Sequence, residues 1–136
     1  MIASIVVFAS IFSLQARAAE IPRECASDEC IVRLAIPAYP DLAVSAKLTG
    51  TVRAELQLDP GGVRDTQISG AANLLKDAVG RAIQDSAFHV DGVRTLSLQF
   101  DFVIRGKPIK GSHWTAYALG AHHYEIVSRP RSPIPD

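Results

Sequence analysis

Two long segments of the chain alternate between apolar and polar residues. In Thr51–Asp59, and again more strongly in Thr95–Ile104, nearly every second residue is apolar and those between are mostly polar. A period of two is typical of a β-strand with one buried and one solvent-exposed face. Pro60-Gly61-Gly62 favours a turn, because proline presets a negative φ and glycine allows a positive one. Val63–Ser69 then alternates more weakly, so the chain predicts three strands.

Helical periodicity is found in two other places. Asn73–Gln84 carries an apolar stripe at intervals of three and four residues, with charged residues outside the stripe. A shorter helical run leads from Pro40 to Gly50. The order is therefore helix, strand, strand, helix, strand, and each element has one apolar face. This order predicts an α+β fold in which two helices pack on one face of a small, three-stranded antiparallel sheet.

The N-terminus predicts export from the cytoplasm. Ile2–Leu14 is almost wholly apolar, and Ala16-Arg17-Ala18 follows it as a small-x-small cleavage pattern. We interpret residues 1–18 as a secretory signal peptide that is cut after Ala18. So short an apolar helix reaches only about 20 Å, whereas the hydrocarbon core of a bilayer is about 30 Å thick. An uncleaved membrane anchor is therefore the less favoured alternative.

The two cysteines, Cys25 and Cys30, lie in an N-terminal arm formed by residues 19–34. An even number of cysteines in an exported chain favours a disulfide, which here ties down the arm before the first helix. Free thiols or a redox role are the alternative. Metal binding by this pair requires further ligands at suitable spacing, and none stands nearby in the sequence.

The charge balance bears on one class of partner. The full chain has 14 basic and 14 acidic side chains, and cleavage removes only one of them, Arg17. The mature chain is therefore close to neutral and slightly acidic. It has no overall positive field to attract nucleic acid, and we expect no nucleic-acid partner.

No motif organises the side chains that could carry catalysis or hold a metal. Ser86, His89 and Asp91 are close in sequence, but no nucleophile elbow surrounds them. His122 and His123 are adjacent, so in a strand they face opposite sides and do not readily chelate one ion. We expect a protein without enzymatic activity, cofactor or bound metal.

The residues after Lys107 differ from the rest of the chain. Residues 108–136 are rich in aromatic groups and end in a proline-rich segment. We expect His113–Ser128 to form a hairpin around Gly120, because so many apolar groups are not typical of a solvated linker. This hairpin covers either the open face of the sheet or one of its edges. The proline-rich end lacks the N–H donors of a strand and is expected to be extended.

Several short motifs stand in a familiar order between residues 35 and 107. They are Pro37-Ala38-Tyr39-Pro40, Gly50-Thr51-Val52, Leu58-Asp59-Pro60-Gly61-Gly62-Val63 and Ala87-Phe88, followed by the strand that ends at Ile104. In this order and spacing, the segment resembles the C-terminal domain of the TonB energy-transducer family. The resemblance implies two helices against a three-stranded antiparallel sheet, and a periplasmic location. It also implies that a short segment of an outer-membrane receptor adds as a strand to the sheet edge.

The resemblance and the strand pattern together lead to a candidate binding site. A peptide that adds as a strand satisfies the open backbone groups of an edge strand. We expect Thr95–Ile104 to be this edge. The candidate partner-binding residues are Thr95, Ser97, Gln99, Asp101, Tyr39 and Pro40. The alternatives are an ordinary edge that Asp101 and Arg105 protect from pairing, and a Tyr39 that simply packs as a lid on the core.

The chain as a whole departs from this family. Family transducers keep an N-terminal membrane helix and a long proline-rich linker, whereas residues 19–34 alone separate Ala18 from Ala35 here. We therefore expect an exported module that binds a peptide or protein of the cell envelope and is linked to TonB-dependent transport. The alternatives are a stand-alone transducer that works with separately encoded anchor subunits, and a structural or cell-wall-binding envelope protein. Pairing of two copies through the sheet edge also fits the pattern.

Overall fold

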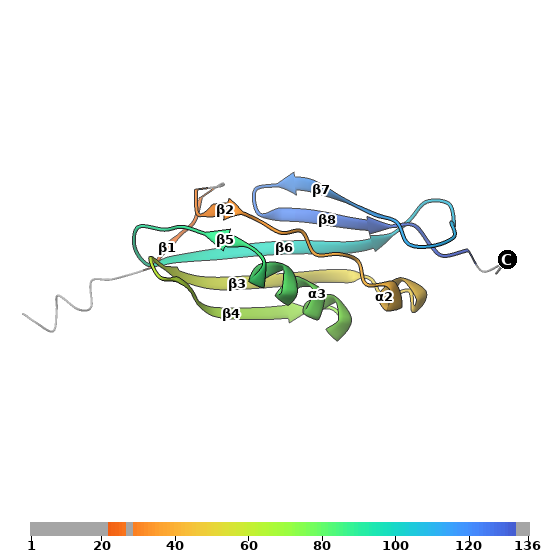
Figure 1. Cartoon of the computed structure of the whole chain (residues 1–136), viewed down its shortest axis with the longest axis horizontal. Coiled ribbons are helices and arrows are strands. Elements are labelled where there is room, and N and C mark those ends of the chain that lie inside the picture. Colours follow the sequence, from red (N-terminus) through yellow and green to blue (C-terminus); the bar gives the residue numbers. More distant parts are fainter. Residues whose placement is uncertain (1–21, 27–28, 133–136) are drawn as a thin grey trace, which may run out of the picture.

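The computed structural model describes residues 22–26 and 29–132, which form a six-stranded mixed sheet, a two-stranded sheet and two helices (Figure 1). The large sheet has the strand order β4-β3-β6-β8-β7, and β1 pairs with the start of β6. The small sheet consists of β2 and β5. The elements are β1 (Arg23–Glu24), β2 (Ile31–Arg33), α2 (Asp41–Ser45), β3 (Gly50–Asp59), β4 (Gly62–Gly70), α3 (Asn73–Gln84), β5 (Ala87–Phe88), β6 (Arg94–Ile104), β7 (Trp114–Gly120) and β8 (His123–Ser128).

The expected α+β fold with a three-stranded antiparallel sheet is wrong, because the described part of the chain is mostly β. The three strands expected from the alternation form the antiparallel β4-β3-β6 part of the large sheet. The sheet then continues past β6, where β8 pairs with β6 in parallel and β7 pairs with β8 in antiparallel orientation. The sheet is larger than expected because β6 has partners on both sides.

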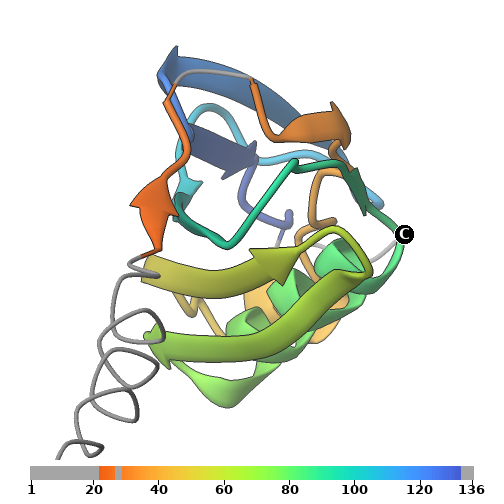
Figure 2. The same cartoon turned by 90° about the vertical axis from the view of Figure 1, so that its left-hand side faces the viewer.

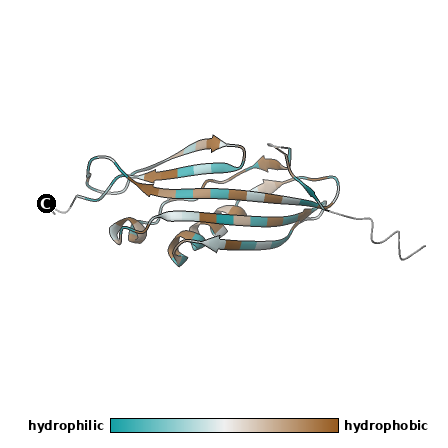
Figure 3. Ribbon diagram, turned by 180° about the vertical axis from the view of Figure 1, so that it is seen from behind, coloured by the Kyte–Doolittle hydropathy of each residue, from teal (hydrophilic) through white to brown (hydrophobic). Residues whose placement is uncertain are grey.

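The alternation along the strands places the core on one side of the large sheet. The inward residues of β3 and β6 are at most 1 % exposed; they are Val52, Ala54, Leu56, Leu58, Leu96, Leu98, Phe100 and Phe102. α3 packs against β3 and β4 and adds Leu75, Val79 and Ile83 to this core, and α2 lies beside α3. Figure 2 shows both helices on the same side of the sheet, and Figure 3 shows hydrophilic and hydrophobic residues alternating along the long strands.

The N-terminal arm is fixed on both sides of a short loop. Cys25 and Cys30 form a disulfide, which confirms the prediction. Before the loop, β1 pairs in parallel with the first residues of β6, and after the loop β2 pairs with β5. The Arg94 guanidinium donates a hydrogen bond of 2.8 Å to the Glu29 carboxylate within this region. β1 pairs only with Arg94 and Thr95, and β2 pairs with β5, so the arm covers only the start of β6.

The predicted hairpin between His113 and Ser128 is present as β7 and β8. It extends the sheet, since β8 pairs with the second half of β6. It also adds to the core, because Ile126 is fully buried and the Tyr124 ring stacks on Phe100 with ring centroids 5.6 Å apart. The hairpin therefore closes an edge and enlarges the core at the same time.

The expected signal peptide, residues 1–18, lies outside the described residues. Within the part of the chain that the structure describes, no helix has the length and apolar character needed to cross a membrane.

The buried side chain of Ile126 gives a test of how the hairpin is held. We expect Ile126→Ala to lower the free energy of unfolding by about 2 to 4 kcal/mol, because it removes buried methyl and methylene groups and leaves a cavity. Leu119→Ala is the matched control on the same hairpin, since Leu119 is 51 % exposed. The control should cost less than about 0.5 kcal/mol. Urea unfolding followed by circular dichroism measures both, and equal losses would contradict docking through Ile126.

Candidate functional site

The four residues expected at a sheet edge lie on an interior strand. β3 pairs along one side of β6, while β1 and β8 pair along the other. Thr95 lies beside β1, and Gln99 and Asp101 lie beside β8. The expectation that Thr95–Ile104 forms the edge is therefore wrong. Of the four residues, Ser97 alone lies between the end of β1 and the start of β8.

Tyr39 and Pro40 belong to the core side of the fold. Pro40 is the residue at the N-cap of α2. The side chain of Tyr39 meets Phe102 edge-on, with ring centroids 5.2 Å apart, and its hydroxyl donates a hydrogen bond to the Leu48 carbonyl. Burial raises the pKa of Tyr39 to about 12. Because Tyr39 is only 3 % exposed, little of its surface is open to a partner.

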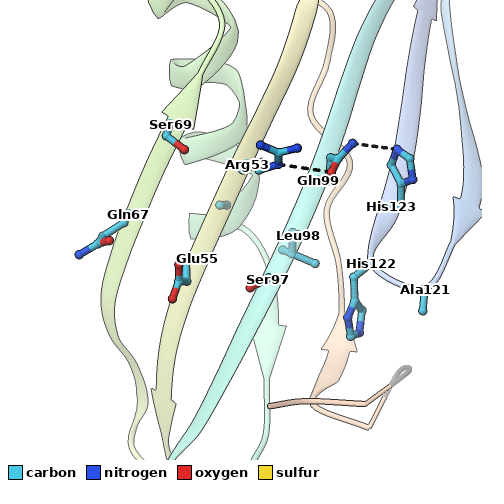
Figure 4. A pocket seen from close by; sticks show the side chains of 11 residues that line it. Arg53, Glu55, Gln67, Ser69, Ser97, Leu98, Gln99, Ala121, His122 and His123 are labelled. Carbon is cyan, nitrogen blue, oxygen red and sulfur yellow. Dashed lines mark hydrogen bonds between the residues drawn. The ribbon is translucent and has the colours of Figure 1, made fainter. Parts of the chain in front are cut away.

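A polar network crosses the outer face of the sheet at Asp101. Its carboxylate accepts hydrogen bonds from the Thr51 hydroxyl at 2.8 Å, from the Gln99 amide at 3.2 Å and from His123 Nε2 at 2.8 Å. A carboxylate only accepts, so Nε2 carries the hydrogen in this contact. Figure 4 shows Gln99 between His123 and Arg53. The Nε of Arg53 donates a hydrogen bond of 3.4 Å to Gln99 Oε1.

This network favours the ionised form of Asp101. Burial raises the pKa of Asp101, but the hydrogen bonds from His123, Thr51 and Gln99, together with the charge of His123, bring the pKa below its usual value. The partners come from β3, β6 and β8, so one carboxylate holds three neighbouring strands together. The network therefore fixes the C-terminal hairpin to the centre of the sheet.

The terminal strands in the main strand order of the large sheet are β4 and β7, and the two-residue β1 lies off this order and pairs with β6 alone. Backbone groups along a strand point alternately toward its two sides. The Arg129 N–H donates to the His113 carbonyl just before β7. The backbone N–H and C=O groups of the odd-numbered residues in this region therefore point toward β8. The backbone groups of Trp114, Ala116 and Ala118 consequently face away from β8. Among the described strands none pairs with them, and these N–H and C=O groups are open to an added strand.

The side chains of the two terminal strands differ. β7 contains no charged residue, and Trp114, Tyr117 and Leu119 are 36, 49 and 51 % exposed. β4 instead exposes Arg64 and Asp65. Charged residues discourage pairing at an edge, whereas an uncharged apolar edge favours it. β7 is therefore the better edge for strand addition. The sequence signal for it was the aromatic density of the tail, which we interpreted as cover for the open face of the sheet or for one of its edges.

The side chains considered for catalysis do not converge. Ser86 Oγ donates to the Ala82 carbonyl and accepts from the Ala35 N–H, so its hydroxyl serves the backbone. His89 Nε2 and the Asp91 carboxylate lie 3.9 Å apart, with both side chains largely exposed. Within residues 22–26 and 29–132, no three His, Cys, Asp or Glu side chains are placed to hold a metal ion.

No known protein family, no curated protein and no solved structure matches this chain. The resemblance of residues 35–107 to the C-terminal domain of the TonB family therefore stays a prediction from motif order.

Asp101 gives the fold a dependence on acid that can be measured. A carboxyl group whose pKa is lower in the folded state stabilises the fold above its unfolded-state pKa of about 4. This contribution is lost as the pH falls through the folded-state pKa. We expect Asp101→Asn to lower the free energy of unfolding by about 1 to 2 kcal/mol at about pH 7, and by less at about pH 3.

Urea unfolding at the two pH values measures this difference. Asp65→Asn is the control, because Asp65 is an exposed carboxylate on β4. The control should change the free energy of unfolding little at either pH. A loss for Asp101→Asn that is the same at both pH values would contradict the role of the ionised carboxylate.

Proposed function

We propose that this protein is a non-enzymatic module of the cell envelope that binds an extended segment of another protein by strand addition. The observation that carries the proposal is the open β7 edge, which has unpaired backbone groups, exposed apolar side chains and no charge. An incoming strand satisfies the backbone groups, and contacts between side chains supply selectivity.

The side chains of β7 form two faces that an added strand meets separately. Ala116 packs against the core, so Trp114 and Ala118 share the core face of the sheet. Tyr117 and Leu119 lie on the outer face. Side chains directly opposite one another in neighbouring strands interact most strongly. The edge is therefore suited to an extended segment of low charge with apolar residues on both faces.

Displacement of β8 from β6 is a less favourable route to strand addition. It would expose the buried Ile126 and separate Tyr124 from Phe100. Exposure of one large apolar side chain costs about 2 kcal/mol. The hydrogen bonds between β6 and β8 add to this cost at about 1 kcal/mol each. A segment that adds at β7 loses none of these interactions.

The affinity expected at β7 is modest. Each backbone hydrogen bond contributes about 1 kcal/mol, and the ordering of a flexible segment offsets much of this gain. Packing on Tyr117 and Leu119 adds about 25 cal/mol per Å² of apolar surface buried. We therefore expect dissociation constants between about 1 μM and 1 mM.

The partner class rests on the motif resemblance and not on the edge itself. That resemblance implies a periplasmic segment of an outer-membrane receptor, and thereby a link to TonB-dependent transport. An extended segment of another envelope protein fits the same edge. The alternative of a stand-alone transducer requires a separately encoded anchor subunit, and copurification with an inner-membrane protein would favour it.

Titration with peptides from the periplasmic segments of outer-membrane receptors tests the proposal. We expect changes in backbone amide chemical shift to cluster on residues 114–120, because the open backbone groups lie there. Ala118→Pro should abolish these changes. Proline removes an N–H that faces the open edge, so the substitution costs no hydrogen bond to β8.

Thr66→Pro is the matched control at the other terminal strand. The Ala71 N–H donates to the Thr51 carbonyl, so the backbone groups of odd-numbered residues of β4 point toward β3. Those of Thr66 therefore point away from β3. This variant should bind peptide as the wild type does. Changes that cluster on residues 95–104, or that survive Ala118→Pro and vanish in Thr66→Pro, would contradict addition at β7. So would the absence of changes with every peptide at about 1 mM.

A further inference from the structure

A second candidate site lies in the middle of the sheet, where β6 lacks a neighbour over a short stretch. β1 ends beside Thr95, and β8 begins beside Gln99. The Cys25 N–H donates to the Thr95 carbonyl, and the Gln99 N–H donates to the His122 carbonyl. Because backbone groups alternate in direction, the N–H and C=O of Ser97 point to the same side of β6 as those of Thr95 and Gln99, toward β1 and β8. No described strand pairs with them there.

A hollow of about 430 Å³ extends from β4 across β3 and β6 to the turn that precedes β8, and Ser97 is one of the residues that line it (Figure 4). Ser97 is small and leaves the middle of the hollow open. Ala121 and His122, from the turn between β7 and β8, line the side toward the hairpin. His123 also lines the hollow and is held in place by its 2.8 Å contact with Asp101. This contact fixes the position of His123 in the wall of the hollow without a ligand.

Arg53 and Glu55 border the hollow with opposite charges. They lie two residues apart on the same face of β3, so their Cα atoms are about 7 Å apart. In the register with β6, Glu55 lies beside Ser97 and Arg53 beside Gln99. Both residues are exposed, and among the described residues no ion pair is formed by either of them. A ligand with one positive and one negative end can pair with both.

We propose that this hollow binds a short peptide with free termini, of about the size of a dipeptide. Its amino group lies at Glu55 and its carboxylate lies at Arg53, so its peptide group lies beside Ser97, the neighbour of Glu55 in the pairing of β3 with β6. Two extended residues span about 7 Å, which matches the separation of the Arg53 and Glu55 Cα atoms, whereas a single residue spans half of it. The site is separate from the β7 edge and does not rest on the proposed function.

Titration with L-alanyl-L-alanine, followed through backbone amide shifts, tests the site. We expect changes on Ser97, Leu98 and residues 121–123 at about 10 mM dipeptide. Acetylation of the amino group or amidation of the carboxylate should each weaken binding about threefold, as expected for one exposed ion pair. Blocking both ends should weaken it further.

Two variants test which residue binds the amino group of the dipeptide and which binds its carboxylate. Glu55→Gln should weaken the free dipeptide about threefold and leave the N-acetyl dipeptide unchanged. Arg53→Gln should weaken the free dipeptide equally and leave the amidated one unchanged. Asp65→Asn is the matched control, because Asp65 is a charged residue of the sheet that lies outside the hollow. It should leave the affinity for every peptide unchanged.

Three results would overturn the site. They are the absence of shift changes at about 10 mM dipeptide, equal affinity for the free and the doubly blocked dipeptide, and equal effects of Asp65→Asn and the two hollow variants. Ala118→Pro separates this proposal from the proposed function. It should leave dipeptide binding intact while it abolishes strand addition at β7, so either proposal can fail without the other.

Discussion

The pairing of β6 on both sides is the constraint on which the rest of the structure depends. β6 carries Phe100 and Phe102, which are the largest fully buried side chains of the core. On one side, β3 aligns its own buried residues with those of β6 in antiparallel register. On the other side, β8 adds Ile126 beside Phe102 in parallel register. A register slip of one residue at either contact would turn buried residues toward solvent, so the two contacts fix each other.

The parallel pairing of β6 with β8 requires the chain to skip one strand position. After β6, the chain passes to β7 at the far edge and returns as β8 between the two. The connection between β6 and β7 is held by the segment that follows β8. Ile109 donates its N–H to the Pro130 carbonyl and accepts from the Ser132 N–H. Arg131 then forms an ion pair of 2.9 Å with Asp41 of α2. The C-terminal segment therefore connects the hairpin to the helical side of the fold.

The sequence predicts the local parts of this structure and not the long-range ones. Alternation located β3 and β6, and helical periodicity located α3, because each has one buried face over at least nine residues. The disulfide was predicted from the even number of cysteines and from the expected export of the chain. The pairing of β8 with β6 was missed because β8 does not alternate cleanly and parallel pairing leaves no turn motif between the partners. The contact of His123 with Asp101 was missed for the same reason, because only the pairing of β6 with β8 brings these residues together. β1, β2 and β5 are too short to show any period.

A sheet that grows by a hairpin closes one edge and creates another. Gln99 and Asp101, two outer residues of β6 beside that closed edge, are polar. The new edge, β7, presents Tyr117 and Leu119 instead. Backbone hydrogen bonds are the same at any edge, so selectivity for a segment depends on these neighbouring side chains. The resemblance of residues 35–107 to a strand-adding domain rests on motif order alone, so it does not set the ligand preference of β7. A strand that suits β7 has to offer apolar residues where a strand at β6 would meet polar ones.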